Sequence, residues 1–435
     1  MTIAEENKAS FVEIWLFLLI SVCAAENKKL VQVCLFLFVV LCTIQDFMLQ
    51  LTPLRSLGAS PCIFPLFAIG LVQGAQWLLS TKTRVSRRVL ICLVYVLLTA
   101  LYGLFVFGTS SHGENLLWKG TTSFISVCAI LFATTLDYCK SSVVRSAIYI
   151  AFALVVVGFL FGNSNPLGLP ALTENAVLHS TPLVDVRPRG LASEPSQLSI
   201  TAMVIGLLAV HVTESRIWKF LLFLATIGLL VASGSKGGIL MLFICAIVIS
   251  IVKWHSKWYH VVGLLFVLFP LGLFLIWLIP NIFPAESFAV SGTIPTRFSM
   301  IICALMTVTH HPFGVGFPGF LPAVAKYLPD AMSKLESFFD VPLYFGEVSD
   351  YLTSADMVST KTFFFDQLMR FGIPFALFFF IFIIGLLKRL AVKRQTILFI
   401  AVLAATTAIM TYQPGTGNFA IPIAFGVAFN EVRNG

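Results

Sequence analysis

Long apolar runs follow one another along almost the whole chain, with short polar segments between them. A transmembrane helix needs about 20 mostly apolar residues, within a range of about 17 to 25. Because several of the runs are short, we predict about 12–14 transmembrane helices. The predicted spans are residues 11–24, 30–50, 61–80, 89–108, 120–137, 145–163, 196–214, 217–233, 237–253, 258–280, 363–387, 395–411 and 417–430.

The composition supports a membrane protein and excludes a soluble one. Hydrophobic residues make up 58% of the chain and charged residues 11%, whereas a soluble domain carries about 25% charged residues. A soluble core of this size could not hide 42 Phe side chains. We therefore predict an all-α polytopic membrane protein.

The nine cysteines and the net charge of +8 point to no cofactor or nucleic acid. The cysteines are scattered through apolar runs without a CxxC pair, which indicates small packing residues and neither disulfides nor a metal site. In a membrane protein the positive charge reports orientation. The sequence therefore predicts no metal, no other cofactor and no nucleic-acid partner.

Basic residues gather in alternate short loops. Sixteen of the 28 Lys and Arg residues fall in these loops: Lys28 and Lys29; Lys82, Arg84, Arg87 and Arg88; Lys140 and Arg145; Arg216 and Lys219; Lys253 and Lys257; and Lys388, Arg389, Lys393 and Arg394. The positive-inside rule assigns this side to the cytoplasm. The polar segments 164–195, 233–238 and about 281–360 then share the outer side.

The chain is expected to have four parts. Residues 1–163 form N-terminal transmembrane helices, and residues 164–280 an outer arginine loop with core transmembrane helices. Residues 281–360 form a large outer loop or cap, because about 80 residues are too many for a bare connection. Within that loop, residues 298–308 are expected to form a short interfacial helix. Residues 361–435 form the C-terminal transmembrane helices.

Arg187 and Arg189 stand out on the outer side, in "RPRG" just before a predicted span. One interpretation is interfacial anchoring, with each arginine reaching lipid phosphates. The other is bidentate binding of a substrate phosphate, because Pro188 stiffens the backbone and Gly190 permits a sharp turn.

Lys236 lies in the hairpin "SGSKGG", residues 233–238. The full phosphate-loop pattern of nucleotide-binding proteins is absent. The hairpin is either a plain polar turn or a cation at the start of a helix, where backbone amides also favour anions.

Two further segments carry candidate residues. "HHPFGVGFPGF", residues 310–320, holds the adjacent pair His310 and His311 without an accompanying set of zinc ligands, and we interpret it as a structured loop. Near the start of a span, Asp366 is expected to pair structurally with Arg370 at helical i, i+4 spacing. Lys361 and Arg370 are further outward or shallow cations.

Together these motifs resemble the bacterial O-antigen polymerase and O-antigen ligase superfamily, over residues of about 185–387. The matching pieces are Arg187-Pro188-Arg189-Gly190, Ser235-Lys236-Gly237, "HPFGVGFPGF" and the spacing from Lys361-Thr362 to Gly372. The chain departs from the family at two positions, with Lys236 replacing an arginine and Lys361 replacing the ligase histidine. The second departure favours a polymerase.

The resemblance implies a glycosyltransferase architecture of the GT-C-like kind and a polysaccharide polymerase activity. Repeat units linked to undecaprenyl diphosphate would be joined at the periplasmic face of the bacterial inner membrane, without a metal. Arg187, Lys236 and Lys361 would bind the diphosphate leaving group.

Further residues are assigned on the same basis. Arg189 and Arg297 are secondary cations, and His311 and Asp356 are further substrate-binding candidates. Glu194 is the first candidate general base, because it is close in sequence to the arginine turn, and Asp356 and Glu347 follow it.

The implied partners are the lipid-linked oligosaccharides, membrane lipids, a chain-length regulator and a flippase. Two alternatives stay open. An O-antigen ligase would transfer finished polymer to the lipid A core. A lipid or solute transporter would call for charges in mid-span or inverted repeats, and the predicted spans contain few acids.

Overall fold

The computed structural model describes most of the chain, and helices dominate it. The described residues are 28–45, 60–79, 87–138, 142–161, 189–192, 194–254, 293–338, 343–354, 358–411 and 418–434. Within them, strands are confined to one short antiparallel hairpin of β1 and β2. The prediction of an all-α polytopic membrane protein is confirmed.

The described residues of the first half of the chain form apolar helices and one β-hairpin. In chain order the elements are α2 (Lys28–Leu41), α3 (Ile63–Leu79), α4 (Arg87–Phe107), β1 (Ser110–Ser111), β2 (Glu114–Asn115), α5 (Leu116–Thr135), α6 (Ser142–Phe161), α8 (Pro195–Val212), α9 (Arg216–Ala232) and α10 (Lys236–Trp254). The β-hairpin joins α4 to α5. There the Asn115 side chain accepts hydrogen bonds from the first free amides of α5, at Leu117 and Trp118, so the helix begins at a satisfied N-cap.

The second half has two groups of helices. The first group is α13 (Thr293–His310), α14 (Gly316–Glu336) and the short α15 (Gly346–Asp350), and the second is α16 (Phe363–Val392), α17 (Thr396–Thr411) and α18 (Ala420–Asn434). The helix predicted at residues 298–308 is present and longer than expected. It packs against α14 and α16, with Met300 and Cys303 fully buried.

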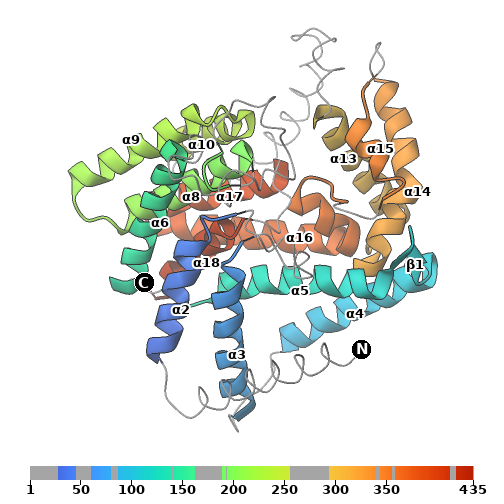
Figure 1. The fold of residues 1–435 in the computed structure, drawn as a ribbon, viewed down its shortest axis with the longest axis horizontal. Helices are drawn as coiled ribbons and strands as arrows, with labels where there is room; N and C mark the ends of the chain where they lie inside the picture. The colour runs from blue at the N-terminus through green and yellow to red at the C-terminus, as the bar shows by residue number, and fades with distance from the viewer. Residues whose placement is uncertain are drawn as a thin grey trace, which may run out of the picture.

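Helices α8 and α17 form the centre of the bundle. Both are apolar on every side and nearly all of their residues are buried, as expected for helices surrounded by other helices. They pack against each other, and α9, α10, α16 and α18 surround them. Figure 1 shows these central helices between the α9–α10 pair and the α13–α15 group.

Helix α14 packs against both α4 and α5, and Figure 1 shows all three on one side of the molecule. Close approach depends on glycines: a Cβ at Gly120 would lie 3.2 Å from the backbone nitrogen of Pro318, and one at Gly103 only 3.0 Å from that of Gly319. The small residues let the backbones touch, as is typical of helix packing in membranes.

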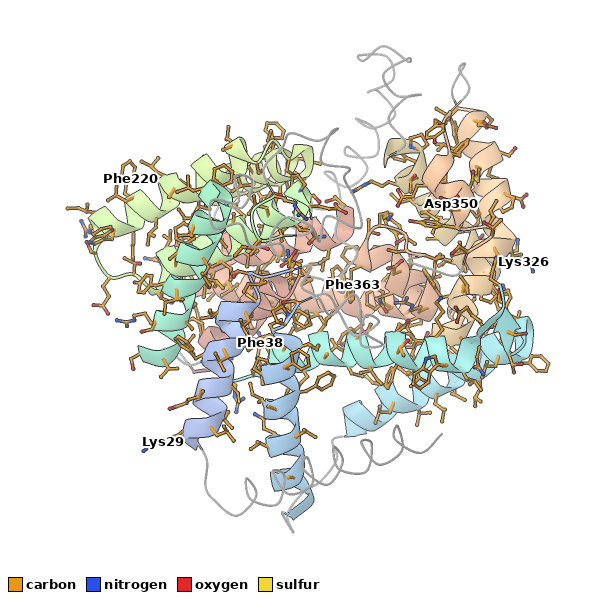
Figure 2. All side chains as sticks on the ribbon, viewed as in Figure 1. Lys29, Phe38, Phe220, Lys326, Asp350 and Phe363 are labelled. Atoms are coloured by element: carbon orange, nitrogen blue, oxygen red, sulfur yellow. The ribbon has the colours of Figure 1, made fainter. Side chains whose placement is uncertain are left out.

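Four described helices are both long and apolar enough to cross a bilayer: Leu116–Thr135, Ser142–Leu160, Pro195–Val212 and Phe363–Val392. Shorter apolar helices cover Lys29–Leu41, Ile63–Ala75, Ile91–Phe107 and Thr396–Thr411. The predicted spans 11–24 and 258–280 lie outside the described residues, so the total of about 12–14 stays a prediction. Outward-pointing apolar side chains such as Phe220 on α9 (Figure 2) suit a lipid-facing surface.

Contacts at the ends of α8 define two opposite ends of the bundle. At its first turn, Gln197 accepts a hydrogen bond from Asn418, which precedes α18, and Ser199 donates one to Ser235, which precedes α10. An 18-residue helix is about 27 Å long, so these contacts lie far from its last turn.

The other end joins different elements. Just beyond α8, Glu214 forms an ion pair with Arg145 of α6, with 3.0 Å between the nitrogen and oxygen. Lys393, after α16, donates to the carbonyl of Val432 near the end of α18 at 2.8 Å. Arg145 is therefore at the opposite end of α8 from the contact between Ser199 and Ser235.

Candidate functional site

The turn before α8 holds the described part of the arginine motif. Gly190 has a φ of 57°, a conformation that favours glycine, and a Cβ there would lie 3.2 Å from the carbonyl carbon of Gly158. The expected sharp turn is present for both reasons. Arg189 is half-buried in this turn, and Arg187 lies outside the described residues.

Glu194 occupies the N-cap position of α8, with Pro195 in the first helical position. Its carboxylate accepts a hydrogen bond from the Ser196 hydroxyl, with 2.9 Å between Oε2 and Oγ. A carboxylate at a helix N-terminus is stabilised by the helix dipole. The first candidate base is therefore fixed at the start of the helix that follows the arginine turn.

The lysine hairpin meets this same helix start. The Ser199 hydroxyl of α8 donates to Ser235 at 3.2 Å, and Ser235 in turn accepts from the amide of Gly238 at 3.1 Å. A Cβ at Gly238 would lie 2.7 Å from the Ser199 Cβ, so the glycine permits this approach. Lys236 begins α10, and nothing is described of its side chain. Two motifs about 40 residues apart in sequence are therefore brought to one place.

A buried amide cluster lies beside the helix start. Asn418 donates to the side chains of Gln197 and Thr201, at 3.2 and 3.0 Å, and Gln45 donates to Thr201 at 3.2 Å. Sequence analysis missed these residues. Their signal was the presence of amide side chains at the ends of apolar runs, where a polar group needs a partner.

Lys361 forms a second polar centre before α16. Its ammonium lies 2.5 Å from the Glu347 carboxylate and 5.7 Å from the centre of the Tyr351 ring. The Tyr351 hydroxyl donates to the same carboxylate oxygen at 3.1 Å. From the sequence, Lys361 is expected to be an outward cation and Glu347 a separate candidate base, whereas the structure joins them.

The surroundings keep Lys361 charged. Burial by itself would lower the pKa of this lysine, but Tyr351 and Glu347 outweigh burial, and the pKa lies above its ordinary value. Burial raises the pKa of Tyr351 to about 12, against the opposing effect of the lysine. The ammonium and the neutral phenol therefore both persist at neutral pH.

Asp366 shapes the backbone that carries Lys361. Its two carboxylate oxygens accept hydrogen bonds from the amide of Thr360, at 2.7 Å, and from the hydroxyl of Ser359, at 3.2 Å. Lys361 itself has a φ of 61°, which is uncommon for a residue with a side chain. Asp366 and Arg370 attract each other electrostatically, as the predicted pairing requires, but no direct ion pair joins these two described residues.

The Arg370 guanidinium lies against two aromatic rings of α14. Its central carbon is 4.5 Å from the centre of the Phe320 ring and 5.2 Å from that of Phe317. The side chain is only 8% exposed. These aromatic contacts accompany the electrostatic attraction between Arg370 and Asp366.

Helix α16 is broken at Gly372, which has a φ of 61° and a ψ of −155°. The loop after α13 fills the break: the amide of Ile373 donates to Pro312 at 2.8 Å, and the amide of Val315 donates to Met369 at 3.0 Å. A Cβ at Gly372 would collide with the Pro312 carbonyl oxygen. The motif spacing from Lys361 to Gly372 thus corresponds to the first half of α16, from the turn before the helix to the break.

Tyr95 of α4 closes the same junction. Its hydroxyl lies 2.9 Å from the Phe313 carbonyl oxygen and 2.7 Å from that of Phe371. Gly314, with a φ of 84°, packs directly on the Arg370 backbone. The loop of residues 311–315 is therefore structured, as expected, and it supports the break in α16. Residues 316–320 of the predicted loop instead begin α14.

His311 sits in a buried contact between α4 and α14. Its Nδ1 lies 2.8 Å from the Tyr102 hydroxyl and its Nε2 lies 3.0 Å from that of Tyr327. Burial lowers the pKa of His311, and the nearby charges of Lys326 and His310 lower it further. Figure 2 shows Lys326 at the periphery of α14. The histidine is therefore held neutral, with both ring nitrogens occupied.

The last two candidate residues are Arg297 and Asp356. Arg297, near the start of α13, donates to the carbonyl of Thr411 at 3.4 Å, which links α13 to the end of α17. Asp356 lies outside the described residues.

Comparison with known proteins agrees with the motif order. Residues 220–380 match the model of a family described as O-antigen ligase. The chain is 24% identical over 393 residues to an uncharacterised 49.5 kDa protein in the cps region of Klebsiella pneumoniae, covering 88% of this chain and 89% of the relative. No solved structure matches the chain. The family match, which covers α10, the break in α16 and the loop that fills it, confirms the resemblance of this integral membrane protein to the O-antigen polymerase and ligase superfamily.

Proposed function

We propose that the protein is a surface-polysaccharide polymerase. It joins oligosaccharide repeat units carried on undecaprenyl diphosphate, at the periplasmic face of the bacterial inner membrane. The observation that carries the proposal is the Ser199–Ser235 contact, which sets the arginine turn and the lysine hairpin side by side at one end of the bundle. The cps region in the name of the Klebsiella relative agrees with this role.

The proposed reaction is glycosyl transfer with a lipid diphosphate as leaving group. A hydroxyl of the acceptor attacks the anomeric carbon of the donor, the new carbon–oxygen bond forms, and the bond to the diphosphate oxygen breaks. Arg187, Arg189 and Lys236 neutralise the charge that develops on that oxygen. Pre-arranged cations of this kind stabilise such a transition state strongly, so we expect activity in the presence of EDTA.

A carboxylate must take the proton of the attacking hydroxyl. Glu194 is our first candidate because α8 begins there, beside the arginine turn. Glu347 is the second: Lys361 and Tyr351 fix its orientation. In this role Lys361 positions a carboxylate as well as adding positive charge near the leaving group.

A ligase is the alternative, and Lys361 argues against it. The superfamily resemblance places a histidine at this position in ligases, and a lysine with a raised pKa cannot exchange protons readily near neutral pH. A polymerase would cooperate with a flippase and a chain-length regulator.

Deletion of the gene followed by gel analysis of surface polysaccharide tests the proposal. A single-repeat pattern is expected, because repeats are still made and attached. Full-length polymer that accumulates on the lipid carrier would identify a ligase, and an unchanged ladder would refute both activities.

Complementation of the deletion strain tests the cations. Arg187→Lys should lose most polymer although the charge is kept, because lysine cannot form two parallel bonds to a phosphate. Lys236→Arg should be tolerated and Lys236→Ala should not, with a loss of roughly a hundredfold. Normal polymer from both Arg187→Ala and Lys236→Ala, at equal protein in the membrane, would reduce the two residues to interfacial anchors.

A further inference from the structure

Arg370 is a buried cation whose donors have no acceptor. Within the described part of the chain, its guanidinium has no hydrogen bond or ion pair, and its contacts are the Phe317 and Phe320 rings. The rings offer no acceptor oxygen or nitrogen to the five N–H groups of the guanidinium. These aromatic contacts therefore leave the donors of Arg370 without an acceptor among the described residues.

Such an arrangement is costly unless an anion completes it. A charged group taken out of water without hydrogen bonds loses far more solvation than stacking returns. Nε of Arg370 is fully buried and unpartnered. The two terminal nitrogens, which are not among the fully buried unpartnered atoms of the described residues, keep some accessible surface. An anion can therefore reach the end of the guanidinium.

Gln367 provides a second, independent observation. It is 2% exposed, and among the described residues neither its amide nitrogen nor its amide oxygen has a hydrogen-bond partner. Residues three apart are neighbours on a helix surface, so Gln367 and Arg370 share one side of the first half of α16. A buried amide donor and a buried guanidinium together form a typical oxyanion-binding pair.

Asp366, one turn before Arg370, attracts it electrostatically. Among the described residues, however, no hydrogen bond or ion pair joins the two side chains, and the Asp366 oxygens accept from Ser359 and Thr360. The break at Gly372 ends the helix two residues after Arg370, where the loop of residues 311–315 covers it. The site is thus fixed on both sides, while the N–H donors of Arg370 have no acceptor among the described residues.

We propose that Arg370 and Gln367 bind the phosphate oxygens of a lipid-linked diphosphate, at a site separate from the arginine turn and the lysine hairpin. This inference rests on the proposed function. In a polymerase both the growing chain and the incoming repeat are attached to lipid diphosphates, so two diphosphates must be held at once. The site on α16 takes the diphosphate that does not leave, that of the acceptor.

Binding of farnesyl diphosphate tests the proposal without any turnover, using the purified full-length protein in nanodiscs. Arg187→Ala and Lys236→Ala are present throughout, so that the proposed site for the leaving diphosphate does not contribute. Arg370→Met keeps a similar side-chain volume and removes the N–H donors. Affinity should fall roughly 10- to 100-fold, in a variant whose cooperative melting without ligand shows that it is folded. Gln367→Leu should weaken binding several-fold.

Arg145→Met is the matched control, because Arg145 pairs with Glu214 at the opposite end of the bundle. It should leave farnesyl diphosphate affinity unchanged. Competition by phosphatidylglycerol separates the two sources of lipid phosphate: weak competition is expected, and competition equal to that of farnesyl diphosphate would assign the site to a membrane phospholipid and overturn the proposal.

Equal affinity of Arg370→Met and the unchanged protein, or no binding to either, would also overturn it. The proposed function has a separate test. If diphosphate binding depends on Arg370 while the deletion strain makes normal polysaccharide, the anion site stands and the polymerase assignment falls. If deletion gives single repeats but Arg370→Met binds farnesyl diphosphate normally, the polymerase assignment stands and the proposed anion site falls.

Discussion

Lys361 combines a charge with an unfavourable backbone conformation. A left-handed conformation costs a residue with a side chain roughly 1–2 kcal/mol, and it persists here because Asp366 binds the amide of Thr360 and the hydroxyl of Ser359. Lys361→Gly and Lys361→Ala separate the two features. Both should abolish most polymer formation, because both remove the ammonium that holds Glu347.

Stability should distinguish the same two variants. Lys361→Gly relieves the backbone and should melt at a higher temperature than Lys361→Ala, by the equivalent of about 1 kcal/mol. Melting of the purified proteins in detergent and polymer gels from the deletion strain give the two readouts. Wild-type polymer from the glycine variant would show that Lys361 is needed only as a turn residue.

His311 predicts a pH dependence of stability. Its folded-state pKa is lowered from 6.5, chiefly by burial, so below pH 6.5 the unfolded chain binds a proton that the folded one resists. The contribution of neutral His311 to the stability of the folded state is therefore complete above pH 6.5. It is lost as the pH falls through the lowered pKa of the folded state. Melting temperatures between pH 5 and 8 measure it. His311→Gln should flatten the acid side of the curve, and an unchanged slope would assign that slope to other groups.

At the scale of elements, the break in α16 is the feature most sensitive to a single methyl group. Gly372→Ala places a Cβ against the Pro312 carbonyl and 2.6 Å from the Gly314 nitrogen, in a backbone region restricted to glycine. We expect a loss of at least about 3 kcal/mol. Melting of the purified variant, together with the amount recovered in the membrane, checks this.

Gly385 is the matched control in the second half of the same helix. A Cβ there meets nothing within 4 Å, so Gly385→Ala should stabilise the helix by about 0.5–1 kcal/mol. Equal effects of the two alanines would mean that the loop of residues 311–315 does not support the break.

At the scale of the whole molecule, the two ends of α8 predict two faces of the membrane. Ser199 and Ser235 meet at one end, and Arg145 and Glu214 pair at the other. Single cysteines in a cysteine-free background should react with an impermeant reagent from outside near residues 185, 235 and 340. Those near 85, 214, 255 and 391 should react only after the membrane is opened. External labelling at 214 would reverse the orientation.

The sequence by itself determined the fold class and the order of the polar motifs. Apolar runs of helical length admit one structure in lipid, because every backbone hydrogen bond must be made within the segment. The sharp turn at Gly190 and the structured glycine loop could also be predicted, since the conformation of a glycine turn is a local property. These features depend on residues that are close together in the chain.

Only the tertiary structure decided which polar groups meet. Lys361 binds Glu347, fourteen residues before it, and Arg370 lies on the rings of Phe317 and Phe320 while the nearer Asp366 binds its own turn. Apolar helices in lipid are almost interchangeable in hydrophobicity, so their neighbours are chosen by close packing at small residues and by a few polar contacts. Which helices become neighbours therefore depends on how well the shapes of segments distant in sequence fit together. The hydropathy profile of the chain contains no information about this fit.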